Sequence, residues 1–183
     1  MAVLVEGLSG IVRIDSILLR FPGGWDGFAD TCPNATLCAD DKIARVGFMA
    51  PNDVKSFIER LESKGLRYMV DGVAADIAVV DQLQGPLVTC DWLEVGHVEL
   101  KEGEYQVAAC RMKCCPSNDL ILPLGWSYEN SLSMNFEYVS PGNLEKCMKF
   151  LYRDGGLDVY LNLITGKKMY VGRTSSVAEH RPR

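Results

Sequence analysis

Apolar residues recur at intervals of three and four positions in three segments of the chain, the spacing that places them on one face of a helix. The three apolar stripes are Ile14, Ile17, Leu18 and Phe21; Val54, Phe57, Ile58 and Leu61; and Leu144, Cys147, Met148 and Leu151. Pro51 suits the first turn of the second helix, and Gly65 suits its C-terminal end. We therefore predict an N-terminal helical segment, residues 9–32, and two further amphipathic helices.

Shorter apolar runs, bounded by turn residues, predict strands. They cover residues 43–49, 67–70, 75–80, 91–100, 105–112, 134–139, 158–164 and 168–171. Asp71 and Gly72 tolerate the positive φ of a tight hairpin turn, while residues 101–104 and 165–167 fit longer hairpin loops. Strands joined by such short turns pair in antiparallel fashion, so a largely antiparallel sheet is predicted.

One constant shift of the numbering aligns the second and third predicted helices together with their flanking strands. Pro51 then falls on Pro141, and every position of the apolar stripe is apolar in both copies. This pattern predicts two β-α-β-β repeats, at about residues 43–81 and 132–172. A chance similarity between two proline-initiated helices is the alternative, and the preserved order of elements on both sides argues against it.

The predicted fold is therefore α+β: a curved, largely antiparallel sheet made by the two repeats, with an added central hairpin and N-terminal helices. We expect a single domain over residues 1–183. Its parts are the helical segment 9–32, the first repeat extended to 42–100, the central hairpin 91–113, the second repeat 132–173 and a tail 174–183.

Charge and composition argue against two classes of partner. The chain has 19 Lys and Arg against 24 Asp and Glu, a formal net charge of -5, so its average surface repels a phosphate backbone and nucleic acid is not expected. No stretch of about 18 apolar residues predicts a membrane span, and the first residues lack the positive charge of a secretory signal. The seven cysteines suit reduced thiols in the cytoplasm, where we expect the protein.

The order of one strand, one helix and three strands over residues 43–100 resembles the module of the vicinal oxygen chelate family, which includes glyoxalases and bleomycin-resistance proteins. Residues 140–152 also resemble the start of that family's helix. The resemblance implies metal ligands, usually His, Gln or Glu, on the first and last strands of each module. The first strand, residues 43–48, offers none. The implied ligands that remain are Glu94, His97, Glu99 and Glu137.

Aromatic residues that lie beside polar ones predict a ligand-binding cleft. Trp92 is close to Glu94 in the sequence, and Trp126 is close to Tyr128. The candidate ligand-binding residues are Trp92, Glu94, His97, Trp126, Tyr128 and Glu137. Core packing is the alternative role for the tryptophans, and a structural role is the alternative for His97.

Cys110, Cys114 and Cys115 are candidate reactive thiols, because the neighbouring Lys113 is a cation that can activate them. The cysteines lack the paired Cys-x2-Cys spacing of zinc sites. The chain also lacks the glycine-rich phosphate-binding motifs and the nucleophile elbow of hydrolases. No metal site and no cofactor are therefore predicted.

These patterns favour a binding or interaction protein without catalytic activity, whose partner is a small molecule or another protein. Homodimerisation through an exposed strand is compatible with this prediction. One alternative is a metal-assisted enzyme or small-molecule sequestering protein of the vicinal oxygen chelate type, acting through Glu94, His97 and Glu137. A second alternative is an acidic immunity or inhibitor protein that covers a basic surface, which the net charge of -5 recommends.

Overall fold

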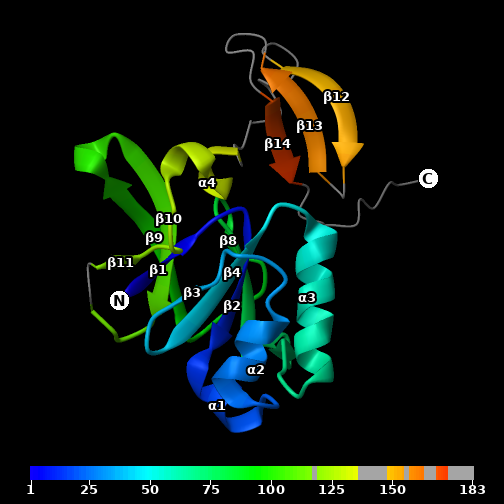
Figure 1. The fold of residues 1–183 in the computed structure, drawn as a ribbon, viewed down its shortest axis with the longest axis vertical. Helices are drawn as coiled ribbons and strands as arrows, with labels where there is room; N and C mark the ends of the chain where they lie inside the picture. The colour runs from blue at the N-terminus through cyan, green and yellow to red at the C-terminus, as the bar shows by residue number, and fades with distance from the viewer. Residues whose placement is uncertain (117–118, 136–147, 155–156, 163–167, 173–183) are drawn as a thin grey trace.

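The computed structural model describes residues 1–116, 119–135, 148–154, 157–162 and 168–172, and it confirms an α+β fold with antiparallel sheets (Figure 1). In chain order the elements are β1 (Ala2–Val5), β2 (Leu8–Arg13), α1 (Ile14–Arg20), α2 (Gly24–Thr31), β3 (Cys38–Ala39), β4 (Ile43–Phe48), α3 (Pro51–Ser63), β5 (Met69–Val70), β6 (Val73–Ala74), β7 (Ile77–Asp81), β8 (Gly85–Pro86), β9 (Leu93–Leu100), β10 (Tyr105–Met112), β11 (Leu120–Ile121), α4 (Leu132–Asn135), β12 (Met148–Asp154), β13 (Leu157–Asn162) and β14 (Lys168–Gly172). Short 3-10 turns at Lys101–Gly103 and Tyr128–Asn130 complete the set.

A five-stranded sheet, with the order β3-β4-β2-β7-β8, forms the centre of the fold, and helices α1, α2 and α3 cover one of its faces. Its central strands are buried on both faces, because side chains alternate between the two sides of a strand. On β2, Val12 packs beneath the helices whereas Ile11 packs on the opposite face. Ile77 and Ala78 of β7 divide in the same way.

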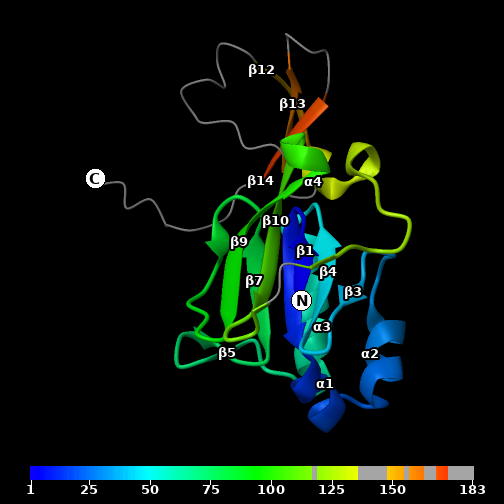
Figure 2. The same ribbon diagram turned by 90° about the vertical axis from the view of Figure 1, so that its left-hand side faces the viewer.

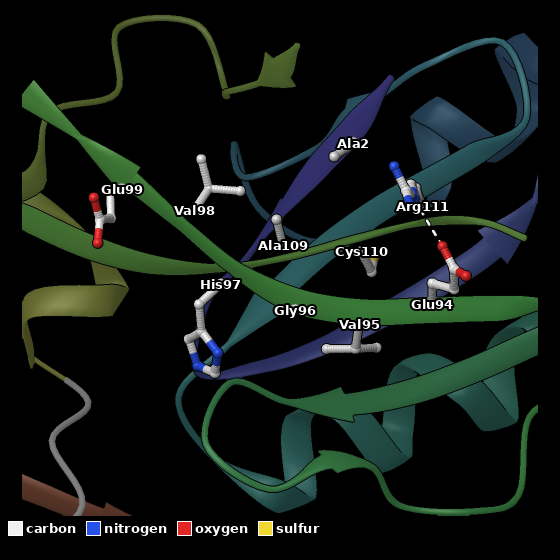
Figure 3. A pocket seen from close by; sticks show the side chains of 10 residues that line it. All are labelled: Ala2, Glu94, Val95, Gly96, His97, Val98, Glu99, Ala109, Cys110 and Arg111. Atoms are coloured by element: carbon white, nitrogen blue, oxygen red, sulfur yellow. Dashed lines mark hydrogen bonds and ion pairs between the residues drawn. The ribbon is translucent and has the colours of Figure 1, made fainter. Parts of the chain in front are cut away.

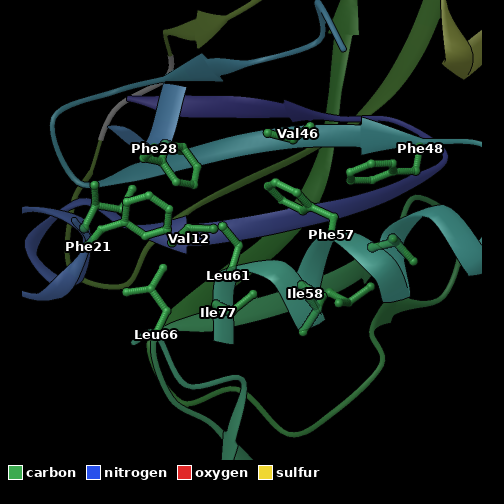
Figure 4. Close-up of a cluster of buried hydrophobic side chains, with 14 of the residues drawn as sticks. Val12, Phe21, Phe28, Val46, Phe48, Phe57, Ile58, Leu61, Leu66 and Ile77 are labelled. Atoms are coloured by element: carbon green, nitrogen blue, oxygen red, sulfur yellow. The ribbon is translucent and has the colours of Figure 1, made fainter. Parts of the chain in front are cut away.

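Helix α3 docks onto this sheet through the stripe predicted from the sequence. Its buried residues are Val54, Phe57, Ile58 and Leu61. Pro51 lies in the first turn, and the chain leaves the helix at Gly65, whose φ of +102° is one that glycine adopts at little cost. In Figure 4 Phe57 lies beside Phe48, with 5.3 Å between the ring centroids. A Cβ at Gly10 would lie 3.3 Å from the Phe57 ring, so the close approach of α3 requires a small residue on β2.

A second sheet, with the order β11-β1-β10-β9, packs on the other face of the central sheet, as Figure 2 shows from the side. β1 pairs with β11 in parallel and with β10 in antiparallel fashion. Between the sheets, Val3 and Cys110 share a buried cluster with Ile43 and Val80 of the central sheet. The molecule is therefore layered as helices, sheet and sheet, and β9 lies at the end of the outer layer.

The remaining strands form smaller sheets. β12, β13 and β14 form a three-stranded antiparallel sheet, coloured orange in Figure 1. β5 and β6 form a hairpin that turns at Asp71 and Gly72, whose φ values of 51° and 80° confirm the tight turn predicted there. The central hairpin of β9 and β10 and the hairpin of β13 and β14 also confirm predictions. Among the described helices, none has the length and apolar character needed to cross a bilayer.

The prediction of a helical segment over residues 9–32 is wrong at its start. Strand β2 occupies the first of these residues, and β1 precedes it. Within α1, Ile17 is buried as predicted, but Leu18 is 63% exposed. Ser9 and Gly10 interrupt the apolar run of β2, and a strand buried on both faces shows no alternation that would reveal it.

The pairing predicted for residues 75–80 is also wrong. β7 pairs with β2 and β8, whereas the hairpin turning at Asp71 and Gly72 is confined to β5 and β6. The sequence pattern indicated both strands but gave no sign that β2, far earlier in the chain, lies between β4 and β7.

The third predicted helix is wrong from Met148 onwards, because residues Met148–Asp154 form strand β12. The repeat pairs Met148 and Leu151 with Ile58 and Leu61 of α3, so the two copies differ in structure at these positions. A short apolar stretch fits a helical or an extended period equally well, and here pairing with β13 decides the outcome.

Other parts of the second predicted repeat are not described. The strand predicted at 134–139 begins within α4, and its later residues lie outside the described residues. Residues 136–147, which include the predicted start of the third helix, and the tail 174–183 also lie outside the described residues.

Asp76 links α1 to the chain that follows α3. Its carboxylate accepts hydrogen bonds from the Ser16 hydroxyl at 2.8 Å and the Arg67 backbone N–H at 2.8 Å, and it forms an ion pair with Arg20 at 2.6 Å. Burial alone raises the pKa of Asp76, but the hydrogen bonds from Ser16 and Arg67 and the charges of Arg20 and Arg67 together hold this pKa below its usual value.

We expect this carboxylate to make the fold sensitive to acid. Because the folded-state pKa is lowered, the stabilisation is fully present above the unfolded-state pKa of about 3.9 and is lost as the pH falls through the folded value. Urea unfolding should show Asp76→Asn to be less stable than the wild type at pH 7, with the difference shrinking as the pH falls below the unfolded-state pKa. The exposed Asp41→Asn is the control. An Asp76→Asn difference that is constant with pH would contradict the account.

Candidate functional site

A hollow of about 690 Å³ lies along β9, which ends the four-stranded sheet among the described strands (Figure 3). Residues 94–99, six consecutive positions of β9, line it together with Ala2 of β1 and residues 109–111 of β10. Adjacent residues of a strand project to opposite faces. A lining of consecutive residues therefore means that the hollow is not confined to one face of β9, and Ala2 and residues 109–111 extend it across β10 to β1.

Small residues form the floor of the hollow. Gly96 pairs with Ala109 of β10, and a Cβ placed on Gly96 would meet no heavy atom within 4 Å. Val98 and Glu99 lie toward one end, and Glu94 and Arg111 lie toward the other (Figure 3). The hollow thus has an uncharged floor between two ends that carry charged side chains.

Glu94 and Arg111 are direct register partners on β9 and β10. Arg111 Nε donates to Glu94 Oε2 at 2.8 Å, and both side chains are partly exposed, at 47% for Glu94 and 36% for Arg111. An exposed cross-strand ion pair contributes only about 0.2–1 kcal/mol to stability. Its main effect is to hold one carboxylate and one guanidinium at a fixed place beside the hollow.

His97 lies on the opposite side of β9 from Val98, in line with the alternation of the strand (Figure 3). Glu94 and His97, both predicted as ligand-binding residues, therefore border the hollow from different faces. Glu137, the third member of the implied metal set, lies outside the described residues. Within the described ranges, no group of three His, Cys, Asp or Glu side chains is placed to hold a metal ion.

The predicted aromatic residues lie away from the hollow. Trp92 packs on the cluster between the sheets and donates its indole N–H to the Ala74 carbonyl at 3.1 Å. Trp126 donates its indole N–H to Glu6 Oε1 at 2.8 Å. Tyr128 stacks on Tyr105 of β10, with 4.1 Å between ring centroids. Each of these contacts fastens one segment to another. Trp92 packs against the core, as the alternative role predicts, whereas Trp126 belongs to neither buried cluster.

Glu6, between β1 and β2, forms a buried ion pair with Arg45 of β4. The sequence analysis did not predict this pair. Arg45 Nη2 lies 3.0 Å from Glu6 Oε2, and the side chains are 0% and 2% exposed, respectively. Arg45 also donates to the Ser9 hydroxyl at 3.1 Å and to the Thr36 carbonyl at 3.0 Å. Every charged atom named here has a partner, as a buried ion pair requires.

The other oxygen of Glu6 holds the segment that follows β11. Besides Trp126, it accepts from the Ser133 backbone N–H at 3.3 Å and from the Ser133 hydroxyl at 3.2 Å. These bonds fasten residues 126–133 to Glu6, which directly follows β1. The available sequence signal was a single charge within an apolar stretch, at Glu6 after β1 and at Arg45 within β4.

The candidate thiols are in different environments. Cys110 is 1% exposed, and burial raises the pKa of its thiol well above the usual value, so this side chain is a protonated member of the core. Cys114 is exposed and has a φ of 66°, while Cys115 is half-buried. The three thiols therefore do not share one environment, although they are close in sequence.

A second depression, of about 550 Å³, lies between α3 and the β7–β8 edge. Leu8 and Val79 form its apolar base, and Ile58 and Leu87 are among its walls. Of the predicted ligand-binding residues that the structure describes, none lines it. The hollow at β9 is the better candidate, because it contains two predicted residues and an open strand edge.

Comparison with known proteins identifies no relative: no family model, no curated protein and no solved structure matches this chain.

Proposed function

We propose that the protein binds a polypeptide partner, which adds to the open edge of β9 as a further strand and places side chains in the hollow. The observation that carries this proposal is that six consecutive residues of an end strand line one cavity. A ligand that follows such a lining is itself extended. A compact small molecule, the other predicted kind of partner, would contact one face.

The physical basis is the hydrogen-bonding capacity of a strand edge. Every second residue of an end strand turns its N–H and C=O groups away from the sheet, and an added strand can pair with them. β9 is eight residues long and pairs with β10 over its whole length. Its backbone is therefore already in an extended conformation before a partner binds to its open side. Backbone pairing would supply affinity, and the hollow would select the side chains that enter it.

The placement of the polar groups supports binding in preference to catalysis. The Glu94 carboxylate is paired with Arg111, and His97 lies on the other side of the strand. A metal-assisted reaction of the vicinal oxygen chelate type needs ligands that converge on one point. Glu94 and His97 on opposite sides of β9 do not favour that alternative.

Filling the hollow tests the proposal. Gly96→Val adds a side chain where a Cβ meets open space, and valine is favoured in strands, so the fold should keep or gain stability. The probe is a fluorescent eight-residue peptide of alternating threonine and valine, followed by anisotropy. We expect Gly96→Val to weaken its binding by about tenfold or more, equivalent to about 1.4 kcal/mol.

Lys149→Val, which places the same valine side chain at an exposed position of β12, is the control and should bind as the wild type does. Thermal unfolding of both variants verifies that they fold. Undiminished binding by a folded Gly96→Val variant would overturn the proposal, as would a wild-type protein that does not bind the peptide.

A further inference from the structure

We infer, resting on the proposed function, that the partner of β9 is an extended segment with alternating character: apolar side chains lie over Gly96 on the face of Val98, and basic side chains lie on the opposite face of β9, toward Glu99. The alternation follows from the geometry of a strand, because consecutive residues of the added segment face opposite sides of the sheet. The two sides of β9 present different chemistry to that segment.

The preference for apolar side chains follows from the face of the strand pair that carries Gly96, Ala109 and Val98. The floor carries no charge, and the two charges on this face of the strand pair, Glu94 and Arg111, already neutralise each other. An apolar side chain of moderate size, such as valine, fits above Gly96 without leaving either charge unpaired. A charged side chain there would lose water without gaining a partner.

On the other side, the charge is acidic. Glu99, at the end of β9, shares the parity of His97 and therefore its face. Glu102 and Glu104 follow in the hairpin loop, and all three carboxylates are exposed. Among the ion pairs between described residues, none includes Glu99, Glu102 or Glu104.

The two described cations closest to this hairpin in the strand pair have other partners. Lys101 lies 3.6 Å from the Glu129 carboxylate and over the Tyr105 ring, and Arg111 pairs with Glu94 at the opposite end of β9. This end of β9 therefore keeps a net negative charge, which attracts a basic segment and raises its rate of association.

The same charge disfavours a second copy of this chain as the occupant. Pairing β9 with its own copy would bring two acidic edges together, and like charges across a strand pair are destabilising. A basic segment of another protein relieves that repulsion. The acidic end of β9 is then the place where the chain would cover a basic surface, a role that the net charge of -5 favours.

Three eight-residue peptides test the inference by fluorescence anisotropy: alternating valine and lysine, valine and glutamate, and valine and threonine. In about 50 mM salt we expect the lysine peptide to bind at least about tenfold more tightly than the glutamate peptide. The difference should shrink at about 500 mM salt, where charges separated by more than about 4–5 Å are screened. Gly96→Val should weaken all three.

Removing the acidic charges supplies the matched comparison. The variant E99Q/E102Q/E104Q should weaken binding of the lysine peptide by about five- to tenfold and leave the threonine peptide unchanged, a few tenths of a kcal/mol per charge. Glu59→Gln, which removes an equally exposed charge on α3, should change neither.

The outcomes separate this inference from the proposed function. Equal binding of the lysine and glutamate peptides, both lost in Gly96→Val, would overturn the basic preference and leave strand addition intact. Binding of no peptide would overturn both. Sedimentation that shows a dimer dissociated by Gly96→Val would overturn the choice of partner in favour of a second copy.

Discussion

Glu6→Ala is expected to lower the free energy of unfolding by about 3–5 kcal/mol, because it leaves the Arg45 guanidinium as a buried charge without its partner. Arg45 is 0% exposed, so it cannot regain water without moving β4. The same substitution removes the acceptor for Trp126 and Ser133. Urea unfolding measures the loss, and amide exchange should show residues 126–133 to be the first to lose protection.

A double variant separates the charge from the packing. Glu6→Leu combined with Arg45→Met removes both charges at similar volume, and such replacements of buried pairs are often neutral or stabilising. We expect the double variant to recover more than half of the stability lost in Glu6→Ala. An exposed ion pair contributes at most about 1 kcal/mol to the free energy of unfolding. If Glu6→Ala lowers that free energy by no more than this, the ion pair is not buried in solution.

Phe57→Ala is the second substitution with a large expected effect, about 3–5 kcal/mol of unfolding free energy. Phe57 is 2% exposed and lies between α3 and the central sheet, where its ring touches the position above Gly10 and packs on Phe48. Its removal leaves a cavity that the sheet cannot close. Leu19→Ala, at a side chain that is 80% exposed, is the control and should cost less than about 0.5 kcal/mol.

Thermal unfolding of the two variants gives the comparison directly. Helix α3 should also exchange its amide hydrogens faster in Phe57→Ala than in the wild type, because the helix is docked mainly through this face. Equal midpoints for Phe57→Ala and Leu19→Ala would contradict the assignment of α3 to the core.

Local patterns in the sequence predicted some elements well. Helix α3 combines an apolar stripe with a proline at its start and a glycine after its end, so three independent signals agree. The hairpin of β9 and β10 has its polar turn between two apolar runs. In both cases the determinants lie within a few residues of each other.

Long-range pairing was beyond such patterns. β2 lies between β4 and β7, and β1 pairs with β10 and β11, which are distant in the sequence. The helix predicted through Leu151 failed because a short apolar stretch contains no signal of its partner, β13. Tertiary contacts decide such segments.

The candidate site was partly predicted. Glu94 and His97, which were predicted from the sequence, do border the hollow, and their binding of a ligand stays a prediction. Gly96 went unnoticed, although glycine inside a strand indicates close approach of another backbone. The role of Trp126 at Glu6 depends on two residues 120 positions apart, which no local pattern connects.

The most direct test of strand addition at β9 is a set of intermolecular nuclear Overhauser effects between isotope-labelled protein and the unlabelled valine–lysine peptide. Contacts from the peptide backbone to successive residues of 94–99, with a valine methyl group near Gly96, are the predicted result. Contacts gathered instead at Val54, Ile58 and Leu87, in the depression beside α3, would contradict the account.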